Sequence, residues 1–248
     1  MTPEPLEPLE PLEPLAEDWQ RALAIVAHPD DMEFGAAAAV ARWTGQGKEI
    51  GYCMVTSGEA GIDGLAPEQC RAVREAEQIE SARIVGVDSV EFLGLPDGII
   101  EYGVELRLVI AGVVRRYRPE IVITGNFRDT FPGGFLNQAD HIATGRAVLD
   151  AVRDAGNRWI FPGEGGEPWG GVRQVWAAGS PLARHAADTT DTFQSGVESL
   201  KAHKAYIDGL GWEHFDPAEF LEGLSRQTGT RLGTTFAAPF EVYNLGWS

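Results

Sequence analysis

Short apolar runs alternate with longer amphipathic stretches from Arg21 onward. The runs rich in apolar and β-branched residues lie at 22–28, 49–56, 89–94, 120–126 and 172–178. Stretches whose apolar positions recur every three to four residues lie at 34–46, 67–86, 102–117, 139–155 and 193–209. The first pattern is typical of strands and the second of helices.

Strands that alternate with helices predict an α/β fold. Right-handed crossovers then produce a mostly parallel sheet that is covered by helices on both faces, a three-layer sandwich of the Rossmann-like kind. We expect one domain over residues 21–248, because no composition shift divides this region; the glycine-rich stretch 161–171 is interpreted as a surface loop. In such folds, chemistry collects at the carboxyl ends of the strands.

The first residues carry an exact triplet repeat, "EPLEPLEPLEPL", over residues 4–15. Proline at every third position excludes a helix and fits the three-residue turn of polyproline II. We therefore expect residues 1–20 to form a disordered tail, and deletion of residues 1–15 to leave folding nearly unchanged. A ligand for a proline-binding domain is the alternative, although the acidic residues disfavour it.

The chain is strongly acidic, with a formal net charge of −17. This charge argues against extended contact with nucleic acid or with an anionic membrane, both of which select basic surfaces. No apolar run approaches the ~20 residues of a membrane span, and no signal peptide is evident. We expect a cytoplasmic protein that acts on a small molecule. Cys53 and Cys70, the two cysteines, are expected to be free thiols.

A histidine, a proline and two aspartates follow the first predicted strand as His28, Pro29, Asp30 and Asp31. Aspartate is a favourable N-cap, so helix capping explains part of this cluster without any function. His28 changes the interpretation, because a divalent cation accepts imidazole nitrogen and carboxylate oxygen together. His28 and Asp31 lie three residues apart across a turn and can meet at one ion. A catalytic zinc site needs one more protein ligand.

Among the other histidines, His141 is the best candidate for the third ligand. It follows the fourth predicted strand at the start of a helix, which brings it to the same edge of the sheet as His28. His185 and His214 lie in polar, loop-like contexts and are expected at the surface. His203 lies on a predicted helix, where it could approach the pocket or pack in the core, and packing is the expected role.

Three segments together resemble one known family. They are "AHPDDMEFGAAAAVARWTGQGKEIGYCMVTSGEAG", "REAEQIESARIVGVDSVEFLGLPDG" and "NQADHIATGRAV". In order and spacing they resemble the PIG-L/LmbE-like deacetylases, closely over residues 21–155 and loosely afterwards. The resemblance implies an LmbE-like fold and a metal-dependent hydrolase, usually with Zn²⁺, although Fe²⁺ accepts the same ligands. Its substrate would be a small N-acyl amino sugar that loses an acetyl group.

The resemblance also implies roles for the cluster. His28, Asp31 and His141 would hold the metal, and Asp30 would be the general base. Elementary chemistry agrees, because zinc brings the pKa of bound water near 7. Asp30 is adjacent to a ligand without having to bind the metal. It can therefore take a proton from water and return it to the leaving amine.

Two more positions match residues that line the sugar pocket in the family, Arg74 and Asp97. Without the resemblance, Arg74 could equally form a surface ion pair with Glu75 or Glu77. Asp97 could be an ordinary turn residue before Gly98.

The chain departs from the commoner family pattern just before His141. Many members have His-Pro-Asp-His where this chain has Gln138, Ala139, Asp140 and His141, and Phe135 and Leu136 occupy a stretch associated with a tyrosine. Gln138 is expected to contact substrate through a neutral amide. Asp140 is expected to support the metal site without binding the metal.

Two alternatives remain beside deacetylation. An amidase that removes a larger acyl group, from a thiol conjugate or a natural product, would use the same ligands. A non-catalytic metal- or sugar-binding module would share the fold, although the chain has neither a G-x-G-x-x-G after the first strand nor a P-loop. Such a module has no need of Asp30 beside a complete set of ligands.

Overall fold

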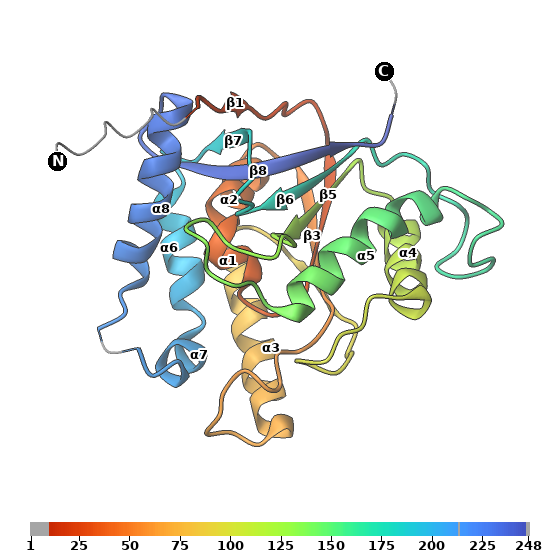
Figure 1. The fold of residues 1–248 in the computed structure, drawn as a ribbon, viewed down its shortest axis with the longest axis horizontal. Coiled ribbons are helices and arrows are strands. Elements are labelled where there is room, and N and C mark those ends of the chain that lie inside the picture. Colours follow the sequence, from red (N-terminus) through yellow and green to blue (C-terminus); the bar gives the residue numbers. More distant parts are fainter. Residues whose placement is uncertain (1–9, 213, 247–248) are drawn as a thin grey trace, which may run out of the picture.

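One eight-stranded sheet lies between two layers of helices (Figure 1). The computed structural model describes residues 10–212 and 214–246. The strands run in the order β1-β7-β8-β6-β5-β2-β3-β4, with β8 antiparallel to both neighbours and the other pairs parallel. The predicted α/β fold with a mostly parallel sheet is therefore confirmed. The strands are β1 (Glu13–Pro14), β2 (Arg21–Val26), β3 (Glu49–Met54), β4 (Ser89–Phe92), β5 (Ile121–Gly125), β6 (Gln174–Ala178), β7 (His185–Asp188) and β8 (Ala237–Asn244).

Helices α4 and α5 cover one face of the sheet, and α1, α2, α3, α6 and α8 lie on the other side (Figure 1). The helices are α1 (Asp31–Gly35), α2 (Ala37–Gly45), α3 (Pro67–Ile84), α4 (Val104–Tyr117), α5 (Ala139–Ala155), α6 (Phe193–Lys201), α7 (Lys204–Gly209) and α8 (Pro217–Leu232).

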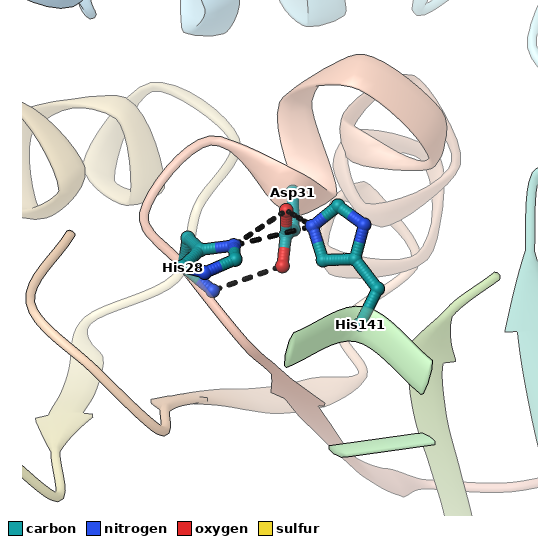
Figure 2. Close-up of side chains that lie close together, drawn as sticks. All are labelled: His28, Asp31 and His141. Atoms are coloured by element: carbon teal, nitrogen blue, oxygen red, sulfur yellow. Dashed lines mark hydrogen bonds and ion pairs between the residues drawn. The ribbon is translucent and has the colours of Figure 1, made fainter. Parts of the chain in front are cut away.

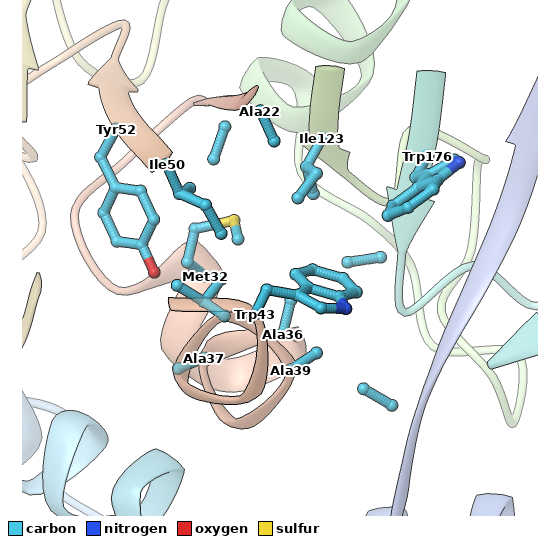
Figure 3. Packing of buried hydrophobic residues seen from close by; sticks show 14 of the residues in the cluster. Ala22, Met32, Ala36, Ala37, Ala39, Trp43, Ile50, Tyr52, Ile123 and Trp176 are labelled. Carbon is cyan, nitrogen blue, oxygen red and sulfur yellow. The ribbon is translucent and has the colours of Figure 1, made fainter. Parts of the chain in front are cut away.

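Strand β2 contributes to both cores because successive side chains of a strand point to opposite faces. Ala22, Ala24 and Val26 pack in the core that contains α2, whereas Leu23 and Ile25 pack against α4 and α5. Figure 3 shows part of the first core, where side chains from α1 and α2 lie under β2, β3, β5 and β6. A strand that is buried on both faces has a continuous run of apolar residues, and residues 22–27 form such a run.

The order of the strands reverses between β2 and β5. From β2 the chain proceeds to β3 and β4 on one side and then returns to β5 on the other. A crevice at such a switch point, outside the carboxyl ends of the strands, is where open α/β sheets bind their ligands. The segments that follow β2 and β5 carry His28 and His141, so the topology brings both histidines to this point.

Two predicted helices are each broken in two, and several elements were not predicted from the sequence. The predicted helix at 34–46 is two helices that break at Ala36, and the one at 193–209 breaks around His203. Strands β7 and β8 and helix α8 were not predicted. Strand β7 has only four residues, β8 contains Pro239, and α8 contains glycines and threonines that weaken a helical signal.

The N-terminal segment is a correction to the sequence analysis. Residues 1–9 lie outside the described residues, but residues 10–20 are not a disordered tail. Glu13 and Pro14 form β1, which pairs with β7, and Leu12 and Leu15 are buried. Trp19 is fully buried in the aromatic core. Leu12 and Leu15 flank the two residues of β1. They are buried against β7, β8 and α8, and none of these three elements was predicted from the sequence.

Polar contacts hold the same segment. Glu17 accepts hydrogen bonds from Arg42 and from the indole of Trp43, both at the end of α2. Lys48 donates to the backbone carbonyls of Glu17 and Trp19. Trp19 also packs edge-on against Trp43, with ring centroids 5.4 Å apart. Residues 10–20 are thus part of the domain.

We therefore expect Leu15→Ala to lower the free energy of unfolding by about 2–4 kcal/mol, since truncation of a buried leucine loses transfer energy and leaves a cavity. Chemical denaturation followed by circular dichroism measures this change. Glu10→Ala is the matched control, because its ion pair with Arg184 is exposed and contributes little. Equal midpoints for Leu15→Ala and wild type would show that the segment does not stabilise the domain.

The structure also describes the two cysteines, the lengths of the helices and the glycine-rich stretch. Cys53 and Cys70 are buried free thiols. Within the described part of the chain, no helix combines the length and the apolar character that crossing a membrane requires. The glycine-rich stretch at 161–171 is a loop, as predicted.

Candidate metal centre and catalytic site

His28, Asp31 and His141 converge at the switch point (Figure 2). His28 follows β2, Asp31 begins α1, and His141 lies in the first turn of α5. Nδ1 of His28 lies 3.2 Å from Nε2 of His141, and Oδ1 of Asp31 lies 3.0 Å from the same Nε2 and 3.8 Å from His28 Nδ1. The three candidate ligands named from the sequence are thus brought together.

The surroundings fix which nitrogen of His141 carries a proton. Nδ2 of Asn137 donates to the carbonyls of Asn126 and Arg128, so its Oδ1 must be the acceptor that faces His141 Nδ1 at 2.8 Å. His141 Nδ1 therefore donates, and the Nε2 of the neutral ring presents a lone pair.

The surroundings of His28 likewise fix which of its two nitrogens carries a proton. Nε2 lies 3.0 Å from Oδ1 of Asp97 and 3.3 Å from Oδ2 of Asp140, both acceptors, so Nε2 carries a proton. In the neutral ring, Nδ1 presents a lone pair toward His141. Two facing lone pairs repel unless a proton or a metal cation lies between them. A tetrahedral zinc ion with bonds of about 2.0–2.1 Å holds two nitrogens roughly 3.3 Å apart, close to the separation here.

The charges of the cluster also suit a cation. Burial alone would raise the pKa of Asp31, but His141 and His28 hold the pKa of this carboxyl well below its usual range. Burial opposes a charge on His28, yet hydrogen bonds to Asp140, Asp31 and Asp97 raise its pKa well above the usual value. An imidazole that ligates a metal is neutral, so a metal and a proton compete for this site.

A second group, formed by His28, Asp97 and Asp140, also has the composition of a metal site. Its carboxylates are already engaged: Asp140 accepts the N–H groups of Gly98 and Ile100, and Asp97 accepts that of Ala60. Carboxylates that accept a hydrogen bond from a metal-ligating histidine orient the ring and raise its basicity. This arrangement favours Asp97 and Asp140 as partners of the candidate ligand His28.

Asp97 was expected to line a sugar pocket. Its side chain is 6% exposed and faces His28. Burial would raise the pKa of Asp97, but His28 and the backbone N–H of Ala60 lower it below the usual value. The structure thus places this carboxylate beside a candidate ligand, and contact with a sugar stays a prediction.

Asp30 is buried beside the three candidate ligands. Its side chain makes no capping hydrogen bond to α1, so the capping interpretation of this residue is wrong. Oδ2 instead accepts a hydrogen bond from Nη2 of Arg74 at 3.1 Å. Burial raises the pKa of Asp30 to about 6, against the opposing effect of Arg74. A carboxylate with a pKa near 6 is well placed to exchange a proton at neutral pH.

Arg74 is buried on α3 and does not form the surface ion pair that was the alternative interpretation. Besides Asp30, its guanidinium contacts the carbonyl of Pro29 and lies over the ring of Tyr206, 3.8 Å from the centroid. Gly58 and Gly61 pack against the guanidinium. A Cβ atom at either position would lie only about 3.0 Å from its nitrogens, so both glycines allow the close approach. Contact with Asp30 is therefore what the structure shows for Arg74, and contact with a sugar stays a prediction.

The residues that replace the family pattern lie at the surface. Gln138 is exposed and precedes α5, where its side chain makes no capping hydrogen bond. Phe135 and Leu136 are 73% and 83% exposed on the preceding loop. Asp140, by contrast, is buried beneath His28.

A buried polar cluster behind Asp30 was not predicted from the sequence. Glu33 lies at its centre and accepts hydrogen bonds from Gln78 and Ser81, while Nε2 of His203 lies 3.7 Å from its other oxygen. The expectation that His203 packs inside is confirmed. One signal was available: residues 74, 78 and 81 recur at helical spacing, which places polar side chains on the buried face of α3.

Comparisons with known proteins agree with this site. A model of the PIG-L family, described as GlcNAc-PI de-N-acetylase, matches residues 23–152, just over half of the chain. The diacetylchitobiose deacetylase of Thermococcus kodakarensis is 26% identical over 226 residues, which cover 89% of this chain and 82% of that protein. The mycothiol S-conjugate amidase of Streptomyces coelicolor is 25% identical over 228 residues, which cover 82% and 74%.

A solved structure shows the same fold. The N,N'-diacetylchitobiose deacetylase from Pyrococcus horikoshii superposes with a TM-score of 0.83, covering 92% of this chain and 85% of that chain at 22% identity. The matched region of the family model contains both histidines of the cluster and both aspartates of the motif. The chain therefore belongs to the PIG-L family, the family of the GlcNAc-PI de-N-acetylases.

Proposed function

We propose that this protein removes the acetyl group from an N-acetylated amino sugar or sugar conjugate, with a divalent metal held by His28, Asp31 and His141. The observation that carries the proposal is the pair of facing imidazole nitrogens beside Asp31, with Asp30 adjacent. The donor set of two imidazoles and one carboxylate suits Zn²⁺ first, and Fe²⁺ also accepts it. The family membership supports the same reaction.

A metal ion in this site would lower the pKa of a coordinated water toward 7 and so make a nucleophile available at neutral pH. The chain's own groups provide the rest. Asp97 and Asp140 hold the His28 ring through Nε2, and Asn137 holds the His141 ring through Nδ1, so both ligands are oriented in advance.

Asp30 is the proposed general base. Its carboxylate accepts a proton from the attacking water, and the acid so formed gives the proton to the amine that leaves. Arg74 keeps this carboxylate in place and favours its charged form, which opposes the effect of burial.

An amidase that acts on a larger acyl group is the second candidate. The observation that favours it is the similarity to the mycothiol S-conjugate amidase, which extends over most of both chains. Both candidates use the same ligands and the same base, so they differ only in the acyl group and in the remainder of the substrate.

A substrate screen with metal-loaded protein tests the proposal. The panel comprises N-acetylglucosamine, diacetylchitobiose, an N-acetylglucosaminyl inositol and a thiol conjugate with a larger acyl group. Release of acetate from an acetylated sugar is expected. Turnover of the thiol conjugate alone would favour the second candidate, whereas a full metal complement without turnover on any amide would favour a binding module.

We expect Gln138→Ala and Gln138→Leu each to lower kcat/KM modestly, because only a neutral hydrogen-bond donor is lost. A glutamine does not titrate, so neither change should alter the shape of the pH profile. Measurement of kcat/KM from pH 5 to 9.5 for wild type and both variants checks this. Unchanged values in both variants would make Gln138 a structural residue at the start of α5.

A further inference from the structure

The buried amide of Gln78 links α3 to the proposed base. Its side-chain oxygen Oε1 accepts the backbone N–H of Asp30 at 2.8 Å, and its Nε2 donates to Oε1 of Glu33 at 3.1 Å. Gln78 is fully buried. Glutamine is ordinarily exposed to solvent, and a buried glutamine side chain must form hydrogen bonds inside the protein. Its partners here are therefore informative about its role.

Asp30 has a backbone conformation that residues with a side chain rarely adopt. Its φ and ψ are 85° and −17°, in the left-handed region. Such a conformation persists only where the surroundings fix it. The N–H of Asp30 is held by Gln78, and its carbonyl accepts the N–H groups of Glu33 and Phe34. The peptide groups on both sides of the Asp30 side chain are thus held.

The polar cluster behind Asp30 fixes the orientation of the Gln78 amide. Glu33 accepts from Ser81 at 2.6 Å, and the hydroxyl of Ser81 lies 2.8 Å from that of Ser199. The Glu33 carboxylate can only accept hydrogen bonds from a neutral amide, so the amide nitrogen of Gln78 must face it. Its oxygen then necessarily faces the Asp30 N–H. Reversal of the amide would place a donor against a donor and an acceptor against an acceptor.

We propose that Gln78 is a positioning residue: it holds the Asp30 peptide in its left-handed conformation and thereby sets where the Asp30 carboxylate lies relative to His28 and Asp31. Two contacts then fix the base independently, Gln78 on the backbone and Arg74 on the carboxylate. This inference rests on the proposed function, since the position of Asp30 matters for turnover only if it acts as the base.

The first test replaces Gln78 by leucine, which keeps the volume and removes both hydrogen bonds. We expect kcat to fall by about 10–100-fold, because a small displacement of a reacting group has an effect of this size. KM and metal content should stay close to those of the wild type. Thr44→Val is the matched control. It removes a partly buried hydrogen bond between Thr44 at the end of α2 and the carbonyl of Val85 just after α3, far from Asp30, and should lower stability while kcat stays unchanged.

The second test repeats Gln78→Leu in an Asp30→Ala background. If Gln78 acts through Asp30, the second substitution should change the residual turnover less than about twofold, because residues that act together are not additive. A general structural role would lower turnover by the same factor in both backgrounds. If the leucine variant does not fold, Gln78→Met is measured in the same two backgrounds.

The outcomes separate this inference from the proposed function. Loss of turnover in Asp30→Ala together with full kcat in Gln78→Leu would overturn the positioning role and leave the base assignment in place. Equal losses in both backgrounds, or a loss of metal in Gln78→Leu that accounts for its lost turnover, would also overturn it. Full turnover in Asp30→Ala would remove Asp30 as the base, and the positioning role with it.

Discussion

Replacement of Asp30 by asparagine is expected to lower kcat by about 10²–10⁴-fold while the protein retains its metal, because this is the usual contribution of a general base. The asparagine side chain has nearly the same shape and still accepts a hydrogen bond from Arg74, but it cannot take a proton from water. Turnover and metal content should be measured on the same preparation, so that a loss of activity is not confused with a loss of metal.

The pH dependence of the reaction gives an independent measurement of the same role. The pKa of Asp30 is raised to about 6 by burial, so the carboxylate form dominates above that pH and turnover should fall as the pH drops below it. A bound cation moves this limb to lower pH, because positive charge favours the carboxylate. The limb that belongs to Asp30 should be absent in Asp30→Asn. If Asp30→Asn loses the metal and Asp31→Asn keeps it, the two roles must be exchanged.

Substitution of His141 by alanine is expected to remove most of the bound metal. Wild-type protein should carry about one transition-metal ion per chain, and a site with two of its three protein ligands binds far more weakly. The measurement is metal content by elemental analysis after dialysis against a weak chelator. Metal affinity should also fall as the pH drops, since hydrogen bonds to carboxylates raise the pKa of His28 and a proton then competes for the ring.

His185 and His214 provide the controls for this prediction. His185 lies on β7 next to Glu13, and His214 is exposed, so alanine at either position should leave the metal content unchanged. Equal metal retention in all three variants would exclude His141 as a ligand. If Asp97→Asn removes the metal as completely as His141→Ala, the ion lies on the other side of His28, against Asp97 and Asp140.

The sequence predicts the centre of this fold well because its signals there are local. The apolar run of β2 is buried on both faces and is visible in the sequence as it stands. In α3 and α5, buried residues recur every three to four positions, so the helical pattern is also visible within each segment. The positions of His28 and His141 at one edge follow from strand polarity alone. The prediction that Asp30 is the base came from the family resemblance and not from spacing.

What the sequence did not predict depends on elements that are distant along the chain. Leu12 and Leu15 look like parts of an exposed repeat until β7, β8 and α8, formed more than 150 residues later, supply the surface that buries them. The direction of Arg74 depends likewise on Tyr206, whose ring occupies one side of the guanidinium. Side-chain direction of this kind is a property of the assembled layers.

The short strand β1 has a consequence for self-association. It forms one border of the sheet, and an exposed border is normally a template onto which a strand from another molecule can add. The N–H groups of Glu13 and Leu15 point inward to the carbonyls of Arg184 and Ala186 on the β7 side. The residue between them, whose N–H would face outward, is Pro14, which has none. Pro14 thus removes from β1 the outward N–H that a strand of a neighbouring chain would need, and Pro14→Ala should make strand addition at this border easier in concentrated solutions of the protein.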